Sequence, residues 1–269
     1  MEINLKRFIL TLITILAVSV CFDLISTKFF DKSLVFKIVS KLTLILAVFY
    51  IIKKESFLSQ SQKSICNYRI VYLILSLGLI GLSYYYLQSE ITSLEVTIGK
   101  YQNLVFLLSC LAVGFFEELL FRVYAYRSIF NMQSSRKRIV KSILLTSGIF
   151  SIMHFMSFSS FHVYGVIIQV IFAFSFGILM QSIYIRTNSI LLVSSLHGLI
   201  NYLGAYKTRL LPSATRLDID STYTSQEFLS SLISLLFITL IIVLISHVLI
   251  RKDLAKETEE FENLNTIEI

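Results

Sequence analysis

The chain has 269 residues, of which 55% are hydrophobic and 15% charged, and its net charge is +7. A soluble domain of this size carries roughly 25% charged residues, so much of the usual water-facing surface is missing. With a mean hydropathy of +0.76, this composition excludes a disordered chain, a coiled coil, a disulfide scaffold and an ordinary soluble enzyme. The sequence therefore predicts a protein whose main solvent is lipid.

Apolar runs of membrane-spanning length recur along the whole chain. A bilayer core requires about 20 apolar residues in a helix, and these runs are solid rather than alternating, which favours helices over a β-barrel. Their approximate limits are 8–27, 34–52, 70–88, 104–126, 142–158, 163–185, 189–206 and 228–250. We therefore expect an all-α fold, a polytopic membrane helix bundle with about eight transmembrane helices.

The runs suggest a division of the chain into three parts. Residues 1–103 would form three N-terminal transmembrane helices, and the first is expected to be an anchor because no small-residue cleavage site follows it. Residues 104–206 would form a core that carries the motifs described below. Residues 207–269 would supply an extracytoplasmic loop, the final transmembrane helix and an acidic cytoplasmic tail that we expect to be frayed.

The positive charge lies in short clusters between the apolar runs, such as Lys53–Lys54 and Arg251–Lys252. This distribution is typical of a membrane protein in contact with anionic lipid headgroups, and it argues against a nucleic-acid partner. Basic residues are denser in the loops that face the cytoplasm when the N-terminus is inside, whereas Lys37 and Lys41 count among the sparser outer set. Both termini are therefore predicted to be cytoplasmic in the cell membrane.

Ionisable residues inside membrane spans are costly and usually functional. Most of the predicted spans are free of them, and the exceptions gather in 104–126, 142–158 and 189–206. They are Glu117, Glu118, Arg122, His154 and His197, accompanied by Asn201. At about 1.5 Å of rise per residue, the three helices carry these groups to one layer near mid-membrane. The sequence thus predicts a polar site that is reachable from the cytoplasm.

Helical spacing suggests roles for these groups. Glu118 and Arg122 are four residues apart and could form an ion pair, whereas Glu117 points about 100° away with no obvious cation. A buried carboxylate suits a general base, a neutral histidine could help to hold water, and His197 with Asn201 could bind an oxyanion. Alternatively, Glu117, His154 and His197 could ligate Zn²⁺. No cofactor is certain from sequence, and both versions stay open.

Three motifs resemble one known family. They are Glu117-Glu118 followed by Arg122, Phe150 followed by His154, and His197 followed by Asn201, each on its own apolar run. In this order they resemble the CPBP family of intramembrane proteases, also called the CAAX-protease and bacteriocin-processing (Abi) family. The resemblance covers roughly residues 104–205.

The resemblance implies an eight-helix fold and an intramembrane endopeptidase, of glutamate type or metal-dependent. Glu117 would correspond to the water-activating glutamate and His154 to its partner, His197 and Asn201 to the oxyanion-binding pair, and Arg122 to the structural cation beside Glu118. The substrate would be a membrane-associated or lipid-modified peptide or protein. Eukaryotic relatives cut prenylated CAAX tails, and many bacterial ones accompany peptide pheromones, bacteriocin immunity or membrane-protein regulation.

Two other classes of protein are alternatives to a protease. A non-proteolytic immunity or regulatory scaffold could use the same pocket to bind a hydrophobic peptide or a regulatory membrane partner. A transporter would place polar residues along a path across the membrane, and the outer halves of these spans are nearly all apolar. The chain also contains neither an H-E-x-x-H nor a G-x-S-x-G motif, which disfavours two other protease classes.

Overall fold

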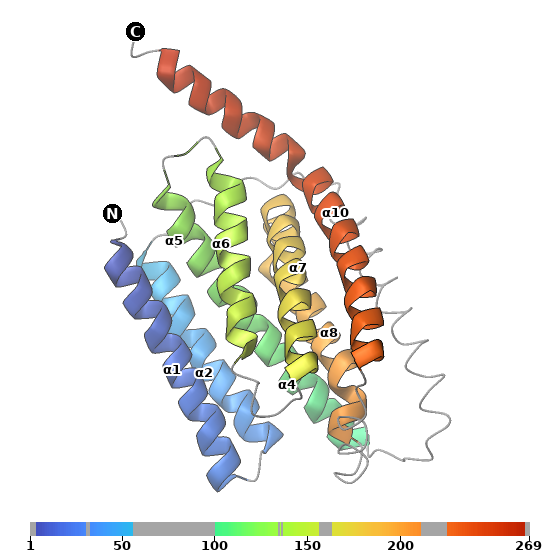
Figure 1. Cartoon of the computed structure of the whole chain (residues 1–269). Helices are drawn as coiled ribbons and strands as arrows, with labels where there is room; N and C mark the ends of the chain where they lie inside the picture. The colour runs from blue at the N-terminus through green and yellow to red at the C-terminus, as the bar shows by residue number, and fades with distance from the viewer. Residues whose placement is uncertain are drawn as a thin grey trace. The chain divides into compact units, whose positions relative to one another are not determined.

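The structure is a computed structural model that describes residues 4–30, 33–55, 100–133, 135, 137–155, 163–210 and 225–266. All the regular structure in these ranges is helical, in agreement with the predicted all-α class. The chain divides into two compact units, each of which is described by itself. Figure 1 shows the helices of both units with their labels.

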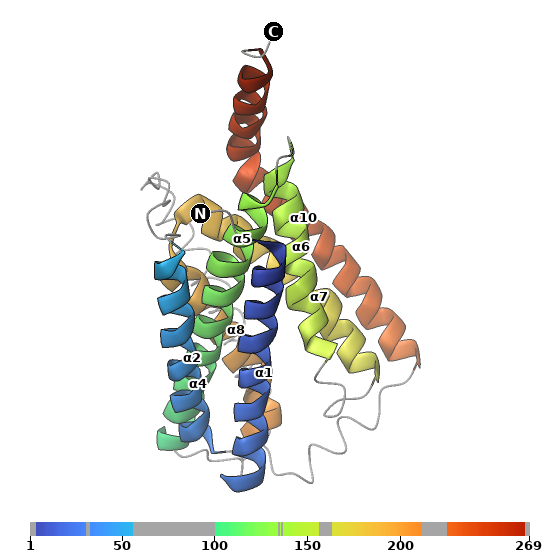
Figure 2. The same ribbon diagram turned by 90° about the vertical axis from the view of Figure 1, so that its left-hand side faces the viewer.

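The first unit comprises residues 5–124 and 189–213. Its helices are α1 (Leu5–Phe29), α2 (Leu34–Lys54), α4 (Lys100–Glu118) and α8 (Ile190–Leu210). Helix α1 packs on α2, α2 packs on α4, and α4 packs on α8. Figure 2 shows α1, α2 and α4 from the side of α1. Helix α4 is thus the central element, with α2 and α8 as its neighbours.

The α1–α2 hairpin is fixed at both of its ends. At the turn, the Ser33 hydroxyl accepts a hydrogen bond from the Phe36 backbone N–H at 3.4 Å and caps α2, a common role for serine. At the open end, Arg7 near the start of α1 forms an ion pair with Glu55, the residue that follows α2. These local contacts hold the two apolar helices antiparallel.

Helix α4 does not continue as a regular α-helix. Directly after Glu118 the chain forms a π-helix, η1 (Leu119–Ala125), followed by α5 (Tyr126–Asn131). Segments of π-helix are rare and occur frequently at functional sites. The apolar pattern of this span predicted one continuous helix, because nothing in it distinguishes a π-helix from an α-helix.

The second unit comprises residues 125–188 and 214–269. In addition to α5, it contains α6 (Arg138–Ile152), α7 (Val163–Thr187) and α10 (Ser225–Thr266). Helix α6 packs on α5 and α7, and α7 packs on α10. One of its apolar clusters is formed by Tyr126, Ile139, Ile143, Ile178 and Ile250. This cluster ties α10 to the other helices of the unit.

The expectation of a frayed C-terminal tail is wrong. Helix α10 continues to Thr266, and the Glu257 side chain, only 5% exposed, contacts the start of α6. Its Oε1 accepts a hydrogen bond from the Ile139 N–H at 3.0 Å and lies 3.4 Å from Nε of Arg138. The first N–H groups of a helix have no partner within the helix, so this carboxylate satisfies one of them. The acidic composition of the tail suggested solvent exposure and concealed this contact.

Within the described residues, 6 helices are long and apolar enough to cross a membrane. They are Leu5–Phe29, Leu34–Lys54, Tyr101–Asn131, Arg138–Phe155, Val163–Thr187 and Phe228–Glu259. The predicted span 70–88 lies outside the described residues, and the apolar part of α8, Ile190–Gly204, is shorter than these six. The chain is a multi-pass membrane protein, but the count of about eight spans and the orientation of the termini stay predictions.

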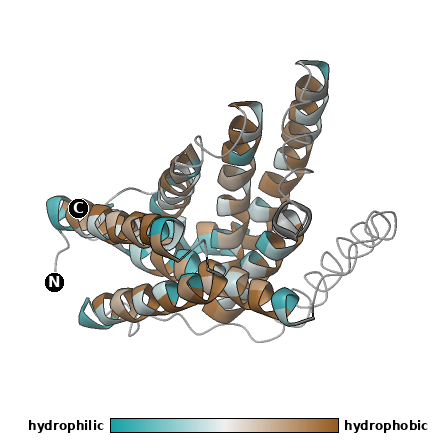
Figure 3. Cartoon of the chain, turned by 90° about the horizontal axis from the view of Figure 1, so that it is seen from below, coloured by the Kyte–Doolittle hydropathy of each residue, from teal (hydrophilic) through white to brown (hydrophobic). Residues whose placement is uncertain are grey.

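The helix surfaces suit a lipid solvent. Figure 3 shows apolar residues along most of each helix, with hydrophilic residues at several helix ends. Large apolar side chains such as Leu46 and Phe237 are 70% and 65% exposed, respectively. In water such surface would be unfavourable, whereas lipid chains solvate it.

The first unit contains one buried charge that the apolar pattern did not predict. Lys41 was counted with the outer loops, yet it lies within α2 and its side chain is 5% exposed. Its Nζ donates to the Ser19 hydroxyl at 2.7 Å and lies 3.3 Å from Oδ2 of Asp23, both on α1. It also lies 5.3 Å from the ring centre of Phe116 on α4. The first two predicted spans are therefore not free of charge.

Candidate active site

Glu118 and Arg122 form the ion pair that their spacing predicted. Nε of Arg122 donates to Oε2 of Glu118 at 2.7 Å, and Nη2 donates to Oε1 at 3.2 Å. Both side chains are 0% exposed. Such a two-point pair between a guanidinium and a carboxylate fixes direction as well as charge. It therefore holds the Glu118 side chain, the last of α4, in one orientation.

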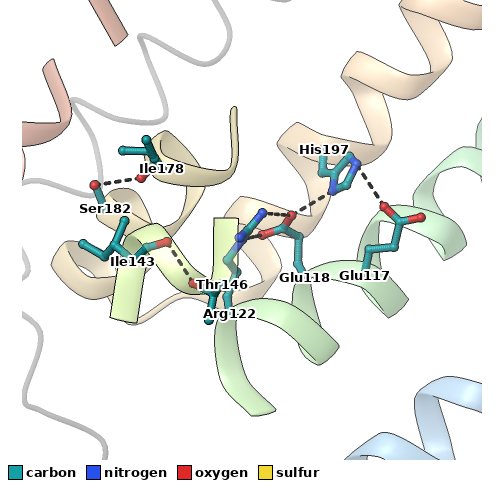
Figure 4. A network of polar contacts seen from close by, with 8 residues as sticks. All are labelled: Glu117, Glu118, Arg122, Ile143, Thr146, Ile178, Ser182 and His197. Atoms are coloured by element: carbon teal, nitrogen blue, oxygen red, sulfur yellow. Dashed lines mark hydrogen bonds and ion pairs between the residues drawn. The ribbon is translucent and has the colours of Figure 1, made fainter. Parts of the chain in front are cut away.

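His197 on α8 lies between the two glutamates of α4, as Figure 4 shows. Its Nδ1 is 2.8 Å from Oε1 of Glu118, and its Nε2 is 3.5 Å from Oε2 of Glu117. The imidazole is 4% exposed and the Glu117 side chain 27% exposed. The partner that the sequence could not assign to Glu117 thus comes from another helix, for which no local spacing gives a signal.

The contacts of His197 determine where its protons lie. Because Arg122 holds Glu118 as a carboxylate, the Nδ1 atom of His197 must carry a proton and donate it. The Nε2 atom faces Glu117 at 3.5 Å, beyond the usual 2.7–3.2 Å of an N–H···O bond. This distance still brings the Glu117 carboxyl group and the ring nitrogen next to each other. A carboxylate and an imidazole in such proximity can act as acid and base.

Asn201 lies one helical turn beyond His197 on α8, on the same face, and is partly buried. Its neighbour Tyr202 donates its hydroxyl to Oδ1 of Asn103 on α4 at 2.5 Å, and its ring lies 5.5 Å from the ring of Phe106. This second contact between α4 and α8 was not predicted from the sequence. An amide at the head of an apolar run was the signal that could have revealed it.

His154 and Phe150 belong to the second unit. His154 follows the end of α6, where its Nδ1 donates to the Phe150 carbonyl at 3.0 Å, and the two rings meet edge to face at 4.9 Å. In a neutral ring this hydrogen bond leaves Nε2 as the acceptor, the form that could accept a proton from water. The structure does not place the units relative to each other, so the partnership of His154 with Glu117 stays a prediction.

The donor atoms of the first unit determine whether it could hold a zinc ion. Both oxygens of Glu118 are engaged by Arg122 and His197, and Nδ1 of His197 is engaged by Glu118. Beside Glu118, this cluster offers the side chains of Glu117 and His197, whereas a catalytic zinc takes three protein ligands. In the parts of the chain that the structure describes, no group of three His, Cys, Asp or Glu side chains could hold a metal ion.

These features define a class of protein. A multi-pass helical chain that buries a glutamate, a histidine and a structural arginine in its spans has the groups expected of an intramembrane hydrolase. Residues 100–203 match the family model described as Type II CAAX prenyl endopeptidase Rce1-like. This model represents the CPBP (Abi) family that the three motifs predicted. No curated protein and no solved structure was found to match the chain.

Proposed function

We propose that the chain is an intramembrane endopeptidase that hydrolyses a membrane-associated or lipid-modified peptide at a site facing the cytoplasm. The family match supports a CAAX-type protease. The observation that carries the proposal is the buried contact of His197 with both Glu117 and Glu118 inside the matched domain. It couples a carboxylate base to an imidazole that can donate a hydrogen bond.

In the proposed reaction, Glu117 accepts a proton from a water molecule, and the water oxygen attacks the peptide carbonyl carbon. The resulting oxyanion accepts hydrogen bonds from Nε2–H of the His197 imidazolium and from the Asn201 amide. When the carbon–nitrogen bond breaks, the leaving nitrogen takes the proton from Glu117. The products are a carboxylic acid and an amine. Glu118 and Arg122 hold the imidazole throughout, and His154 is proposed to assist at the water.

The test is peptide cleavage by the full chain purified in detergent, followed by mass spectrometry. Matched peptides with and without a prenyl group would show whether the lipid is recognised. Glu117→Gln retains shape while removing the base, so kcat should fall about 10²–10⁴-fold. Glu259→Gln removes one carboxylate at an exposed position of α10 and should leave kcat unchanged.

Two further arms separate the alternatives. A zinc chelator that abolishes wild-type turnover would establish metal chemistry, whereas unchanged turnover would support the glutamate mechanism. His154→Ala tests the proposed partner of Glu117. If the wild type cleaves no peptide and Glu117→Gln retains the cellular phenotype, the pocket binds rather than hydrolyses, and the regulatory or immunity scaffold replaces the protease.

A further inference from the structure

Helices α4 and α8 touch by their backbones at Gly114 and Gly198. A Cβ atom on Gly114 would lie 2.6 Å from the Gly198 nitrogen and 2.9 Å from the Ser194 carbonyl oxygen. A Cβ atom on Gly198 would lie 2.7 Å from Cα of Leu111. The clash is reciprocal and involves backbone atoms, which cannot rotate out of the way as a side-chain tip can. Any side chain at either position would therefore force the two helices apart.

This crossing lies within one helical turn of the candidate active site. Gly114 precedes Glu117 by three residues and Glu118 by four, which places it on their side of α4, and Gly198 directly follows His197. The hydrogen bond from His197 to Glu118 spans the same two helices at 2.8 Å. An N–H···O bond weakens beyond about 3.2 Å, so a separation of several tenths of an ångström would break it.

The other glycines on described helices provide a contrast. Among the described residues, no atom lies within 4 Å of a Cβ built on Gly148, Gly165 or Gly204. The nearest atoms to a Cβ on Gly177 belong to Ser147, within the second unit. Close backbone approach through small residues is common between membrane helices, but in the first unit it occurs here beside the site.

We propose that Gly114 and Gly198 are positioning residues of the active site. The absence of side chains at both positions lets α4 and α8 approach closely enough for His197 to reach Glu117 and Glu118 together. The expected effect on catalysis rests on the proposed function. The close approach of α4 and α8, which places His197 beside Glu117 and Glu118, does not depend on it. A misplacement of about 1 Å can cost about 10²-fold in rate, so a single methyl group is a sufficient perturbation.

The experiment compares Gly114→Ala and Gly198→Ala with Gly148→Ala and Gly204→Ala, the same change in open space. The crossing variants should lose at least about tenfold in kcat with little change in KM and with cooperative thermal unfolding preserved. The controls should match the wild type. Full kcat in both crossing variants would overturn the proposal.

A second readout does not depend on proteolysis. With ¹⁵N-labelled histidine, the Nδ1–H proton of His197 should give a resonance shifted far downfield by its bond to Glu118. The resonance should vanish in Gly114→Ala and persist in Gly204→Ala. If the resonance is present in the wild type and vanishes in Gly114→Ala, but the wild type cleaves no peptide, the protease proposal fails while the positioning role stands. If the resonance survives in both crossing variants, the positioning role is wrong.

If an alanine variant does not fold, a measurement on the wild-type protein tests the proposal instead. A nuclear Overhauser contact between the Cα hydrogens of Gly114 and Gly198, observed with labelled glycine, is expected only from a crossing without side chains. The chain has 9 glycines, and each Gly→Ala variant that folds, such as Gly204→Ala or Gly148→Ala, assigns the glycine signal that it loses. Absence of this contact would overturn the proposal.

Discussion

Nδ1 of His197 lies 2.8 Å from Oε1 of Glu118, and both side chains are buried. Glu118 is therefore more than the counter-ion of Arg122, because it determines which nitrogen of the imidazole carries a proton and which faces Glu117. A carboxylate in this position orients the histidine of many hydrolases.

Replacing Glu118 by Gln should consequently impair catalysis without removing any group that touches substrate. The amide can donate to Nδ1 and thereby favour the wrong tautomer, an effect worth about 10⁴-fold in a serine protease. We expect kcat to fall by about 10²–10⁴-fold with KM little changed. Steady-state cleavage measures this, with Glu259→Gln as the control for loss of one carboxylate. Retention of wild-type kcat would show that Glu118 serves Arg122 alone.

Arg122→Met tests the stability side of the same cluster. Its side chain and that of Glu118 are both 0% exposed, so removal of the guanidinium leaves a buried carboxylate with His197 as its remaining partner. Breaking a buried pair in this way costs about 3–5 kcal/mol, measurable by denaturant unfolding in mixed micelles. Lys54→Met is the control, because the Lys54 side chain is exposed at the end of α2, and a surface substitution of this kind usually changes stability by less than about 0.5 kcal/mol. Equal losses in the two variants would contradict the assignment.

The buried Lys41 gives a prediction about the α1–α2 interface. Lys41→Met retains an apolar stem but removes the hydrogen bond to Ser19 and the contact with Asp23. A hydrogen bond to a charged group contributes about 1.5–3 kcal/mol, and we expect a loss of that size, whereas Lys53→Met at an exposed position should change little.

Double-mutant cycles can divide this loss between the two partners of Lys41. The Asp23 side chain is 54% exposed, so its coupling with Lys41 should be only about 0–1 kcal/mol. The coupling with Ser19, which is buried, should be larger. A coupling with Asp23 that exceeds the one with Ser19 would reverse this interpretation.

The sequence was most informative where a contact is local. The Glu118–Arg122 pair follows from a spacing of four residues, and the six described helices that are long and apolar enough to cross a membrane follow from apolar length. The motifs also predicted the family whose model matches residues 100–203, because their residue types and order are specific. These features depend on the chain's own periodicity and not on how distant segments pack.

The remaining features depend on contacts between distant segments. His197 reaches Glu118 from 79 residues away, and Ile139 is capped from 118 residues away, so neither partner could be found by spacing. The buried Lys41 could have been found, since it lies inside a predicted span, but it was assigned to a loop by its charge. The π-helix after Glu118 has no counterpart in the apolar pattern.

The contact of Glu257 with α6 yields the last prediction. Its carboxylate accepts the Ile139 N–H at 3.0 Å and, as an anion, also interacts favourably with the positive end of the helix dipole. Glu257→Ala should cost about 0.5–2 kcal/mol, the usual range for loss of a helix N-cap. Glu259→Ala removes a neighbouring exposed carboxylate and should be neutral by comparison. Hydrogen exchange of the Ile139 amide offers a local measurement, because this proton should exchange faster in Glu257→Ala and at the wild-type rate in Glu259→Ala. Unchanged exchange in both variants would show that α10 does not cap α6 in the membrane.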